Sequence, residues 1–444
     1  LLNKDKACCM NNIAYAAYFK AISIAIRRTF LWFDGEGATL EEVTSCAGWD
    51  LPLGRHGMIS DWEEEKFNRL VDYMPLKLPD EDVASKASNE RYLQYAEPIL
   101  DEIIGELITG KEIWVTWSDF CYDRHSWLSS GSAGAQYTSY EGHNVRLNKR
   151  AYMETVPVED MIEWINLEPI IRAIGSEKHE MGRARAIYGT EMPDQSIMAY
   201  LLSVLEPKLF NIDGVECGMT GRAELLSIIR RKGIVSQDDE ECTMLDYSDF
   251  NRQHTLEVQS LVFKCISKRL RSLGVTEDAI ICAEWCKDAL LNQWVKFPGE
   301  SEYSRSIQGL FSGNRGTNFI NTILNKLYFM VAKKWMIDNL KIEPVNLYAL
   351  HHGDDVWISN KSRLWAIALY KCLQKSMLVF SNKKQIQDLC VAEFLRVVYT
   401  NFGARGYLAR CIATLIERPL QGELDISPTM KAVGVNSQIQ TCYR

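Results

Sequence analysis

Two adjacent aspartates follow a glycine in the segment His351-His352-Gly353-Asp354-Asp355. Short apolar runs at residues 345–350 and 356–358 flank this segment, which predicts a strand, a tight turn and a second strand. Such a hairpin would hold two carboxylates at its exposed tip, where they could bind a hard divalent cation. A Gly-Asp-Asp sequence is by itself more often an ordinary turn, so the chemical interpretation needs support from the rest of the chain.

A second acidic segment, residues 246–251, supplies part of that support. The apolar run at residues 242–245 predicts a buried strand that ends at Asp246. Nucleotidyl transfer by two metal ions needs carboxylates from separate strands around ions that lie about 4 Å apart. Asp246 could provide the second strand if it faced Asp354 across a sheet. In the alternative interpretation, Asp246 and Asp249 only begin a loop.

Residues 178–188 alternate cations with small side chains. In an extended strand, Arg183 and Arg185 would point to the same side, where they and Lys178 could contact a triphosphate. Taken alone, the same pattern fits an ordinary charged edge strand equally well.

A loop that contains glycine leads into a predicted helix at residues 312–325. Thr317, Asn321 and Asn325 recur at a spacing of four, which aligns three hydrogen-bonding side chains on one helix face. A polar stripe is usually a solvated face, but the apolar residues around it indicate a partly buried helix. Buried amides need partners, and a ribose hydroxyl would serve as one.

The size and composition of the chain restrict its class. With 444 residues and 47% hydrophobic content, it exceeds one ordinary domain and is neither disordered nor fibrous. The net charge of −8 argues against nucleic-acid binding over the whole surface but permits basic groups inside a channel. The 13 cysteines include no Cys-x-x-Cys pair, which is typical of a reducing compartment. The apolar stretch at residues 13–26 contains Lys20 and suits a buried helix better than a membrane span.

The pattern of elements is clearer after residue 240 than in the mixed helical and irregular segments before it. Thr255 predicts the cap of a helix that runs to Leu273, with Gly274 as its stop. Further predicted elements are helices at 276–294, 317–340 and 363–377 and short strands at 378–380 and 393–398. This order predicts an α+β core with an antiparallel sheet.

Taken together and in this order, the segments resemble the RNA-dependent RNA polymerases of double-stranded RNA viruses, most closely the totivirus-like group. The family's motif F matches residues 178–188, motif A residues 246–255, motif B residues 312–325 and motif C Gly353-Asp354-Asp355. Motif D matches residues 380–385, motif E residues 392–397, and two earlier family loops match residues 53–55 and 127–132.

The resemblance implies a right-hand fold with fingers, palm and thumb, in which the palm carries the antiparallel sheet. Residues 1–235 would form the fingers with an N-terminal segment, and residues 236–385 the palm, with a fingers insertion around 275–305. Residues 386–444 would hold motif E and the start of a thumb. Because the chain begins with Leu1 and little of it follows motif E, we expect both ends to be truncated.

The resemblance also implies roles for individual residues. The catalytic set would be Asp246, Asp354, Asp355 and Lys384, in which the three aspartates bind Mg²⁺, or alternatively Mn²⁺, and Lys384 protonates the departing pyrophosphate. The triphosphate would be bound by Lys178, Arg183 and Arg185. The ribose would be recognised by Asn251, Ser312, Gly313, Thr317 and Asn321, and the template would be guided by Ser130 and Ser132.

The main alternative within the same fold is a reverse transcriptase-like polymerase. The two hypotheses differ in whether the enzyme selects ribonucleotides or deoxyribonucleotides. Reverse transcriptases resemble this chain in motif A but carry a bulky aromatic residue five positions after the first aspartate. Asn251 stands at that position here, and its amide can recognise a 2′-hydroxyl. The adjacent Phe250 is one position away and is expected to pack below the site. The motif A histidine, His254, is expected to be a packed, hydrogen-bonded core residue.

The implied activity is the template-directed joining of ribonucleotides for genome replication and transcription. The implied partners are an RNA template and product, ribonucleoside triphosphates and a viral capsid protein, which could be fused to this chain, with no membrane. The implied location is the host cytoplasm, within the virion. An RNA-binding structural subunit of the virion is the alternative from another class, but it would need neither the aspartates nor Arg185 and Lys384. A cellular RNA-dependent polymerase is a weaker alternative, because those enzymes generally use a different Asp-rich motif.

Overall fold

The structure is a computed structural model that describes residues 59–416, except for short gaps, and a few residues before them. The gaps lie at residues 129–130, 141–142, 181–182, 218–220, 238, 382–384 and 389–390. Among the described helices, none is both long enough and apolar enough to cross a membrane.

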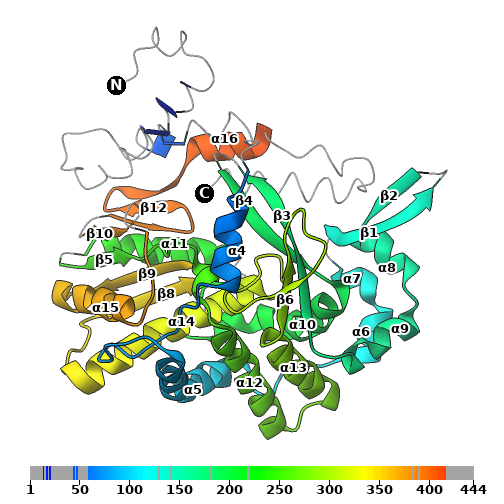
Figure 1. The fold of residues 1–444 in the computed structure, drawn as a ribbon. Helices are drawn as coiled ribbons and strands as arrows, with labels where there is room; N and C mark the ends of the chain where they lie inside the picture. Colours follow the sequence, from blue (N-terminus) through cyan, green and yellow to red (C-terminus); the bar gives the residue numbers. More distant parts are fainter. Residues whose placement is uncertain are drawn as a thin grey trace.

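A four-stranded antiparallel sheet, called the central sheet, lies between a helical layer and a small sheet, on the left in Figure 1. Its strand order is β10 (Ile386–Asp388), β5 (Glu241–Met244), β9 (Asp355–Asn360) and β8 (Tyr348–His352). Successive side chains of β9 alternate between the two faces of this sheet, as strand geometry requires. Val356 and Ile358 belong to the main core, whereas Trp357 packs in a separate core with Phe394 and Tyr399.

Long helices form a layer on the main-core side of this sheet (Figure 1). They are α5 (Lys86–Leu107), α12 (Leu256–Leu273), α13 (Glu277–Leu290), α14 (Thr317–Trp335) and α15 (Arg363–Lys375). The residues of α12 are those predicted, because its caps are locally encoded. Thr255 accepts a hydrogen bond from the Val258 amide, and Gly274 ends the helix with a φ of 64°. A single π-helical segment, Met336–Leu340, extends α14 to the predicted end.

A second four-stranded sheet lies beside this helical layer. Its order is β4 (Arg183–Thr190), β3 (Ile171–Glu180), β6 (Gln293–Lys296) and β7 (Ser304–Arg305). Strand β6 corrects the predicted helix over residues 276–294, which in fact ends at Leu290. Residues 293–296 instead pair in parallel with β3, so a contact distant in sequence overrides the local helical pattern.

A small three-stranded sheet covers the opposite face of the central sheet. It comprises β11 (Val391–Phe394), β12 (Val397–Thr400) and β13 (Gly403–Gly406), and helix α16 (Leu408–Ile416) follows it. The single strand predicted at residues 393–398 is wrong, because Leu395 and Arg396 form the turn between β11 and β12. The strand predicted at residues 378–380 is reduced to one bridge between Phe380 and Tyr247.

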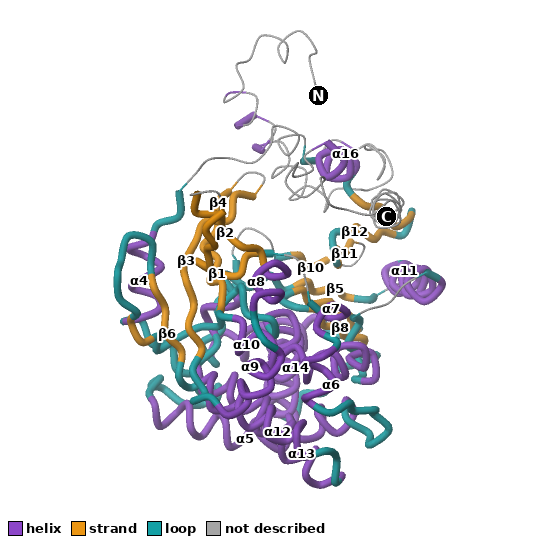
Figure 2. The backbone as a smooth tube through the Cα atoms, turned by 90° about the vertical axis from the view of Figure 1, so that its right-hand side faces the viewer, coloured by secondary structure: helices purple, strands orange, loops and turns teal. Residues whose placement is uncertain are grey.

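The remaining described elements surround these layers. They are α4 (Trp62–Leu70), α6 (Trp117–Tyr122), α7 (Arg124–Trp127), β1 (Ser132–Tyr140), β2 (His143–Asn148), α8 (Lys149–Thr155), α9 (Val158–Ile162), α10 (Met192–Leu205) and α11 (Arg222–Val235), with short 3₁₀ turns at Glu163–Asn166, Glu206–Asn211 and Phe250–Gln253. Figure 2 shows the β3–β4 ribbon on one side of the molecule and strands β11 and β12 on the other. The central sheet is thus flanked by two separate groups of strands.

Candidate active site

The turn between β8 and β9 carries the adjacent aspartates, as the sequence predicts. His352 pairs with Asp355, which leaves Gly353 and Asp354 as a two-residue turn. Gly353 has a φ of 58°, and a β-carbon there would lie 3.0 Å from the side-chain oxygen of Asn318. Both the positive φ and the close approach favour glycine at the first central position of a two-residue hairpin turn.

Side chains of helix α14 hold this turn through hydrogen bonds to its backbone. The hydroxyl oxygen of Thr322 accepts a hydrogen bond from the Gly353 amide at 2.9 Å. The side-chain amide of Asn325 donates to the carbonyl oxygens of Gly353 at 2.9 Å and Asp355 at 3.2 Å. Both helix residues are fully buried. The backbone that carries the aspartates is therefore anchored in the core, so its position does not depend on the exposed turn alone.

Asp246 approaches this hairpin from the neighbouring strand. Thr243 of β5 pairs with Ile358 of β9, and continuing this antiparallel register by three residues places Asp246 opposite Asp355. The backbone carbonyl of Asp246 accepts hydrogen bonds from the Ser381 amide at 2.8 Å and the Gln385 side chain at 2.7 Å. The predicted meeting of the two acidic segments thus follows from the pairing of β5 with β9.

The acidic surroundings of Asp355 raise its proton affinity. The pKa of Asp355 is raised to about 7, first by desolvation and then by the negative charges of Asp354, Glu393 and Asp246, while Arg396 opposes the shift. Asp355 is exposed at the surface, so a cation could reach both its carboxylate and the neighbouring negative charges that repel it. A divalent cation would relieve this repulsion.

The donor chemistry of the aspartates fits a hard divalent metal, which prefers carboxylate oxygens. Within the described part of the chain, no three His, Cys, Asp or Glu side chains already surround one point closely enough to hold a metal ion. The fit therefore rests on the converging strands and their excess negative charge.

The predicted triphosphate-binding residues lie on the β3–β4 ribbon. Lys178 and Arg185 are directly opposite each other in its register, and both are exposed. Like charges in directly opposed positions repel, and a bound anion would relieve that repulsion. The backbone of Arg183 pairs with Glu180, which confirms the extended strand, but its side chain lies outside the described residues.

The loop before α14 docks onto this ribbon. The Gly313 amide donates to the carbonyl of Tyr188 at 3.1 Å, and a β-carbon at Gly313 would lie 2.3 Å from the same oxygen. The Ser312 hydroxyl lies 3.5 Å from the carbonyl of Ala186. The Thr317 hydroxyl reaches carbonyls within its own loop, at 2.8 and 2.9 Å. These contacts explain the loop residues through packing, and their predicted contact with a ribose stays a prediction.

A buried arginine that the sequence reasoning missed supports this loop. The guanidinium of Arg69 donates to the carbonyl of Leu310 at 3.2 Å and lies 4.6 Å from the ring centroid of Tyr188. It thereby connects helix α4, the ribbon and the loop in one packed cluster. Its position in the charged helix Trp62–Leu70 gave no local sign of burial.

The two predicted ribose-binding amides are in contact. The Asn321 side-chain amide donates to Oδ1 of Asn251 at 2.9 Å. Oδ1 of Asn321 lies 3.0 Å from Nε2 of His254, whose Nδ1 lies 2.9 Å from the hydroxyl of Tyr328. His254 is fully buried, as expected, and Phe250 packs against it with ring centroids 4.4 Å apart. The structure thus joins motifs A and B through side chains.

The structure does not describe the side chains of three other predicted site residues. Ser130 and Lys384 lie outside the described residues. Ser132 begins strand β1 and pairs with Asn148, but its side chain is not described. The assignments of these three residues stay predictions.

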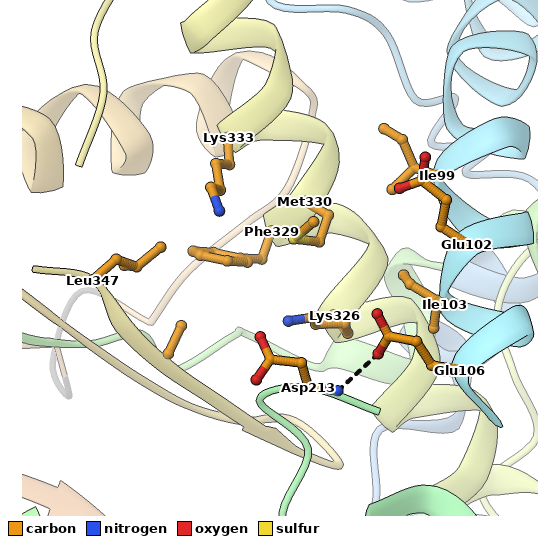
Figure 3. Close-up of a pocket in the computed structure, with 11 residues that line it drawn as sticks. Ile99, Glu102, Ile103, Glu106, Asp213, Lys326, Phe329, Met330, Lys333 and Leu347 are labelled. Carbon is orange, nitrogen blue, oxygen red and sulfur yellow. Dashed lines mark hydrogen bonds between the residues drawn. The ribbon is translucent and has the colours of Figure 1, made fainter. Parts of the chain in front are cut away.

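A pocket of about 130 Å³ lies between α5, α14 and β8, apart from the predicted site residues (Figure 3). The buried Lys326 points toward Asp213 in this view. Burial lowers the pKa of Lys326, while the negative charges of Asp213 and Glu106 raise it. Glu106 also accepts a hydrogen bond from the Asp213 amide at 2.8 Å. Charge compensation within the protein therefore accounts for these residues.

An α+β fold with carboxylates at the ends of neighbouring central strands, beside a basic ribbon, fits the right-hand architecture expected from the sequence. Residues 3–418 match the family model described as viral RNA-directed RNA-polymerase, and the chain belongs to this family.

Three curated relatives support the totivirus-like resemblance. The "Probable RNA-directed RNA polymerase" of Saccharomyces cerevisiae virus L-A is 27% identical over 82% of this chain and 23% of its own length. The protein of the same name from Saccharomyces cerevisiae virus L-BC is 26% identical over 89% of this chain and 25% of its own length. A relative from Leishmania RNA virus 1 - 1 is 26% identical over 67% of this chain and 32% of its own length. The chain thus spans about a quarter of the first two relatives.

Solved structures support the fold class. The RNA-dependent RNA polymerase of a human picobirnavirus matches with a TM-score of 0.56 and 11% identity, over 93% of this chain and 75% of that one. Its insertion loop deletion mutant matches with a TM-score of 0.55 and 12% identity, over 96% of this chain and 80% of that one. At this identity the likeness concerns the fold, and it confirms the predicted α+β right-hand architecture.

Proposed function

We propose that this chain is the catalytic portion of a viral RNA-directed RNA polymerase that joins ribonucleotides on an RNA template. The observation that supports the proposal is the pairing of β5 with β9, whose register continues toward Asp246 and the Asp354-Asp355 hairpin, with α14 holding that hairpin from the core. In this proposal residues 1–235 form the fingers, residues 236–385 the palm and residues 386–444 the start of the thumb.

Asp246 and Asp354 would hold two Mg²⁺ ions, with Mn²⁺ as a possible substitute, and Asp355 would assist them. When bound, such ions activate the attacking hydroxyl and neutralise the leaving pyrophosphate. Desolvation and the negative charges of Asp354, Glu393 and Asp246 raise the pKa of Asp355, which supports this assignment because a bound cation would relieve the repulsion.

Lys178, Arg183 and Arg185 would bind the triphosphate of the incoming nucleotide. The two cations of this set with described side chains are exposed and face each other across the ribbon, as an anion site requires. Lys384 would protonate the pyrophosphate. This role is supported by Ser381 and Gln385, the described residues on either side of it in the sequence, which both contact the backbone of Asp246.

Asn251 and Asn321 would recognise the ribose. They are joined by a hydrogen bond and lie on elements that contact the site: Asn251 follows Asp246, and Asn321 lies one helical turn before Asn325. A polar amide at residue 251, in place of a bulky aromatic side chain, favours ribonucleotides and disfavours the reverse transcriptase alternative.

The partners in this proposal are an RNA template and product, ribonucleoside triphosphates and a viral capsid protein, with Ser130 and Ser132 along the template path. The relatives extend far beyond the matched region, which leaves room for a fused capsid portion. We place the protein in the host cytoplasm, within the virion.

The test is template-dependent RNA synthesis with a single-stranded RNA, ribonucleoside triphosphates and Mg²⁺. Asp354→Ala should abolish the product, whereas Asp82→Ala, which removes an exposed carboxylate from a loop before α5, should not. RNA binding without any product, in a protein that includes the flanking parts of its relatives, would instead support a structural subunit and contradict the proposal.

A further inference from the structure

Four side chains form a continuous hydrogen-bonded row from the core to the proposed ribose site. Tyr328, His254, Asn321 and Asn251 follow one another at distances of 2.9, 3.0 and 2.9 Å. Tyr328 and His254 have no exposed surface, whereas Asn251 is half-buried at the other end. The row therefore connects the solvent-inaccessible core to the side chain of Asn251, which a ligand can reach.

The protonation state of His254 is fixed by its surroundings. Burial lowers its pKa to about 3, and the positive charge of Arg69 lowers it as well, while the hydrogen bond with Asn321 opposes the shift. The ring is therefore neutral near neutral pH and carries a single N–H. Burial also keeps the pKa of Tyr328 well above its ordinary value, so the phenol retains its proton.

Only one position of that N–H satisfies the whole row. The described residues offer the Tyr328 hydroxyl no partner other than Nδ1 of His254, so the phenol must donate to Nδ1. Nε2 then carries the proton and donates to Oδ1 of Asn321. The opposite tautomer would leave a buried phenol proton without an acceptor, which costs about 1–3 kcal/mol.

This arrangement sets the orientation of the amide at the far end. Because Oδ1 of Asn321 accepts from His254, its amide nitrogen faces Asn251 and donates to Oδ1 there. The amide nitrogen of Asn251 is then the group left over, and no residue in the described part of the chain accepts from it. A 2′-hydroxyl oxygen would supply the missing acceptor, whereas a deoxyribose would not.

We propose that His254 and Tyr328 are positioning residues for sugar selection, which orient the amides of Asn321 and Asn251 so that an N–H group faces the 2′-hydroxyl of the incoming nucleotide. This inference rests on the proposed polymerase function. It assigns to two buried core residues an effect on substrate choice that packing alone would not produce.

Tyr328→Phe tests the row with the smallest change in shape. Loss of the phenol proton releases Nδ1, so His254 can adopt either tautomer and the two amides can rotate. We expect the ratio of kcat/KM for a ribonucleotide to that for the matching deoxyribonucleotide to fall about tenfold, the effect of one misplaced hydrogen bond. His254→Leu should lower the ratio at least as much if the protein folds.

Tyr200→Phe is the matched control. Tyr200 is also buried, and its hydroxyl donates to the carbonyl of Val115 at 2.7 Å, within a cluster of aromatic side chains outside the row. This variant loses a similar buried hydrogen bond, so it should show a similar loss of stability with an unchanged sugar ratio.

The decisive quantity is the ratio of kcat/KM for the ribonucleotide to that for the deoxyribonucleotide, because a purely structural role would lower both values together. An unchanged ratio in Tyr328→Phe, whatever its kcat, overturns the inference. Failure of the wild-type protein to incorporate any ribonucleotide would contradict the proposed function instead. In that case the Kd values of ATP and dATP, compared between wild-type and Tyr328→Phe proteins, decide the inference: a preference for ATP that falls in the variant supports it, and equal preferences overturn it.

Discussion

The two charged halves of the proposed site are built differently. The aspartate hairpin is held by buried side chains of α14, with hydrogen bonds of 2.9 Å from Asn325 and to Thr322. The cations Lys178 and Arg185 are exposed, at opposed positions of β3 and β4 in the part of that sheet beyond the pairing with β6. Metal-ion catalysis needs ligands at defined positions, whereas attraction of a triphosphate tolerates longer and less directional contacts. Mutations in the two halves should therefore fail in different ways.

The largest effect is expected from the carboxylate half. Asp246→Asn keeps the size of the side chain but removes the charge that two metal ions need, so we expect kcat to fall at least about a thousandfold. RNA affinity and the temperature of unfolding should change little. Steady-state kinetics and thermal unfolding measure these quantities, and a kcat within tenfold of wild type would remove Asp246 from the proposed site.

The second effect concerns the anchor of the hairpin. Asn325→Ala removes the hydrogen bonds to Gly353 and Asp355 and leaves the buried Gly353 carbonyl and the Asp355 carbonyl without that partner, so we expect about 2 kcal/mol of lost stability. Since the aspartates would also shift, kcat should fall about 10- to 100-fold. The matched control is Asn339→Ala, an exposed residue whose amide donates to the Trp335 carbonyl. Equal effects of the two variants would show that the anchor is unimportant.

The third effect belongs to the basic ribbon. Lys178→Ala should raise KM for the nucleotide about tenfold with a smaller change in kcat, and the rise should shrink at high salt. Stability should change little, because Lys178 is exposed. Arg172→Ala, on the same strand but 3.8 Å from Glu191, is the control. Should it raise KM equally, the ribbon would act through its overall charge.

The smallest effect is expected from metal binding without substrate. Mg²⁺ at ten times its Kd would stabilise the protein by about 1.4 kcal/mol, since it binds the folded chain and relieves carboxylate repulsion. We expect the unfolding temperature to rise by about 1–3 °C for a chain of this size. Asp354→Ala should lose most of this rise, and a full rise in that variant would point to another cation site.

Local signals predicted part of the fold well. Helix α12 follows from its Thr255 cap, its apolar periodicity and the Gly274 stop, all of which lie within a short window. The predictions failed where pairing partners are distant or turn residues are unusual. Strand β6 depends on β3, more than 100 residues earlier, and the turn at Leu395 and Arg396 has positive φ values of 49° and 65° without glycine or asparagine.

The candidate site likewise contains residues that local sequence signals identify and residues that only the structure identifies. The aspartates, the basic run and the polar helix could all be identified from residue types and order. The roles of Thr322 and Gln385 could not, because each acts through a contact with a residue far away in the sequence. The position of His254 beside Asn321 likewise follows from how α14 packs against the segment after β5.

The sequence by itself determined which chemical groups are available and the order in which they occur, because composition and periodicity are local properties of the chain. The tertiary structure alone decided that the strand before Asp246 pairs with the strand that begins at Asp355 and that Gly313 meets Tyr188. It also decided that a buried tyrosine and histidine reach the ribose-binding amides. The physical reason is that strand register and helix packing are set by the burial of side chains from segments that are distant in sequence.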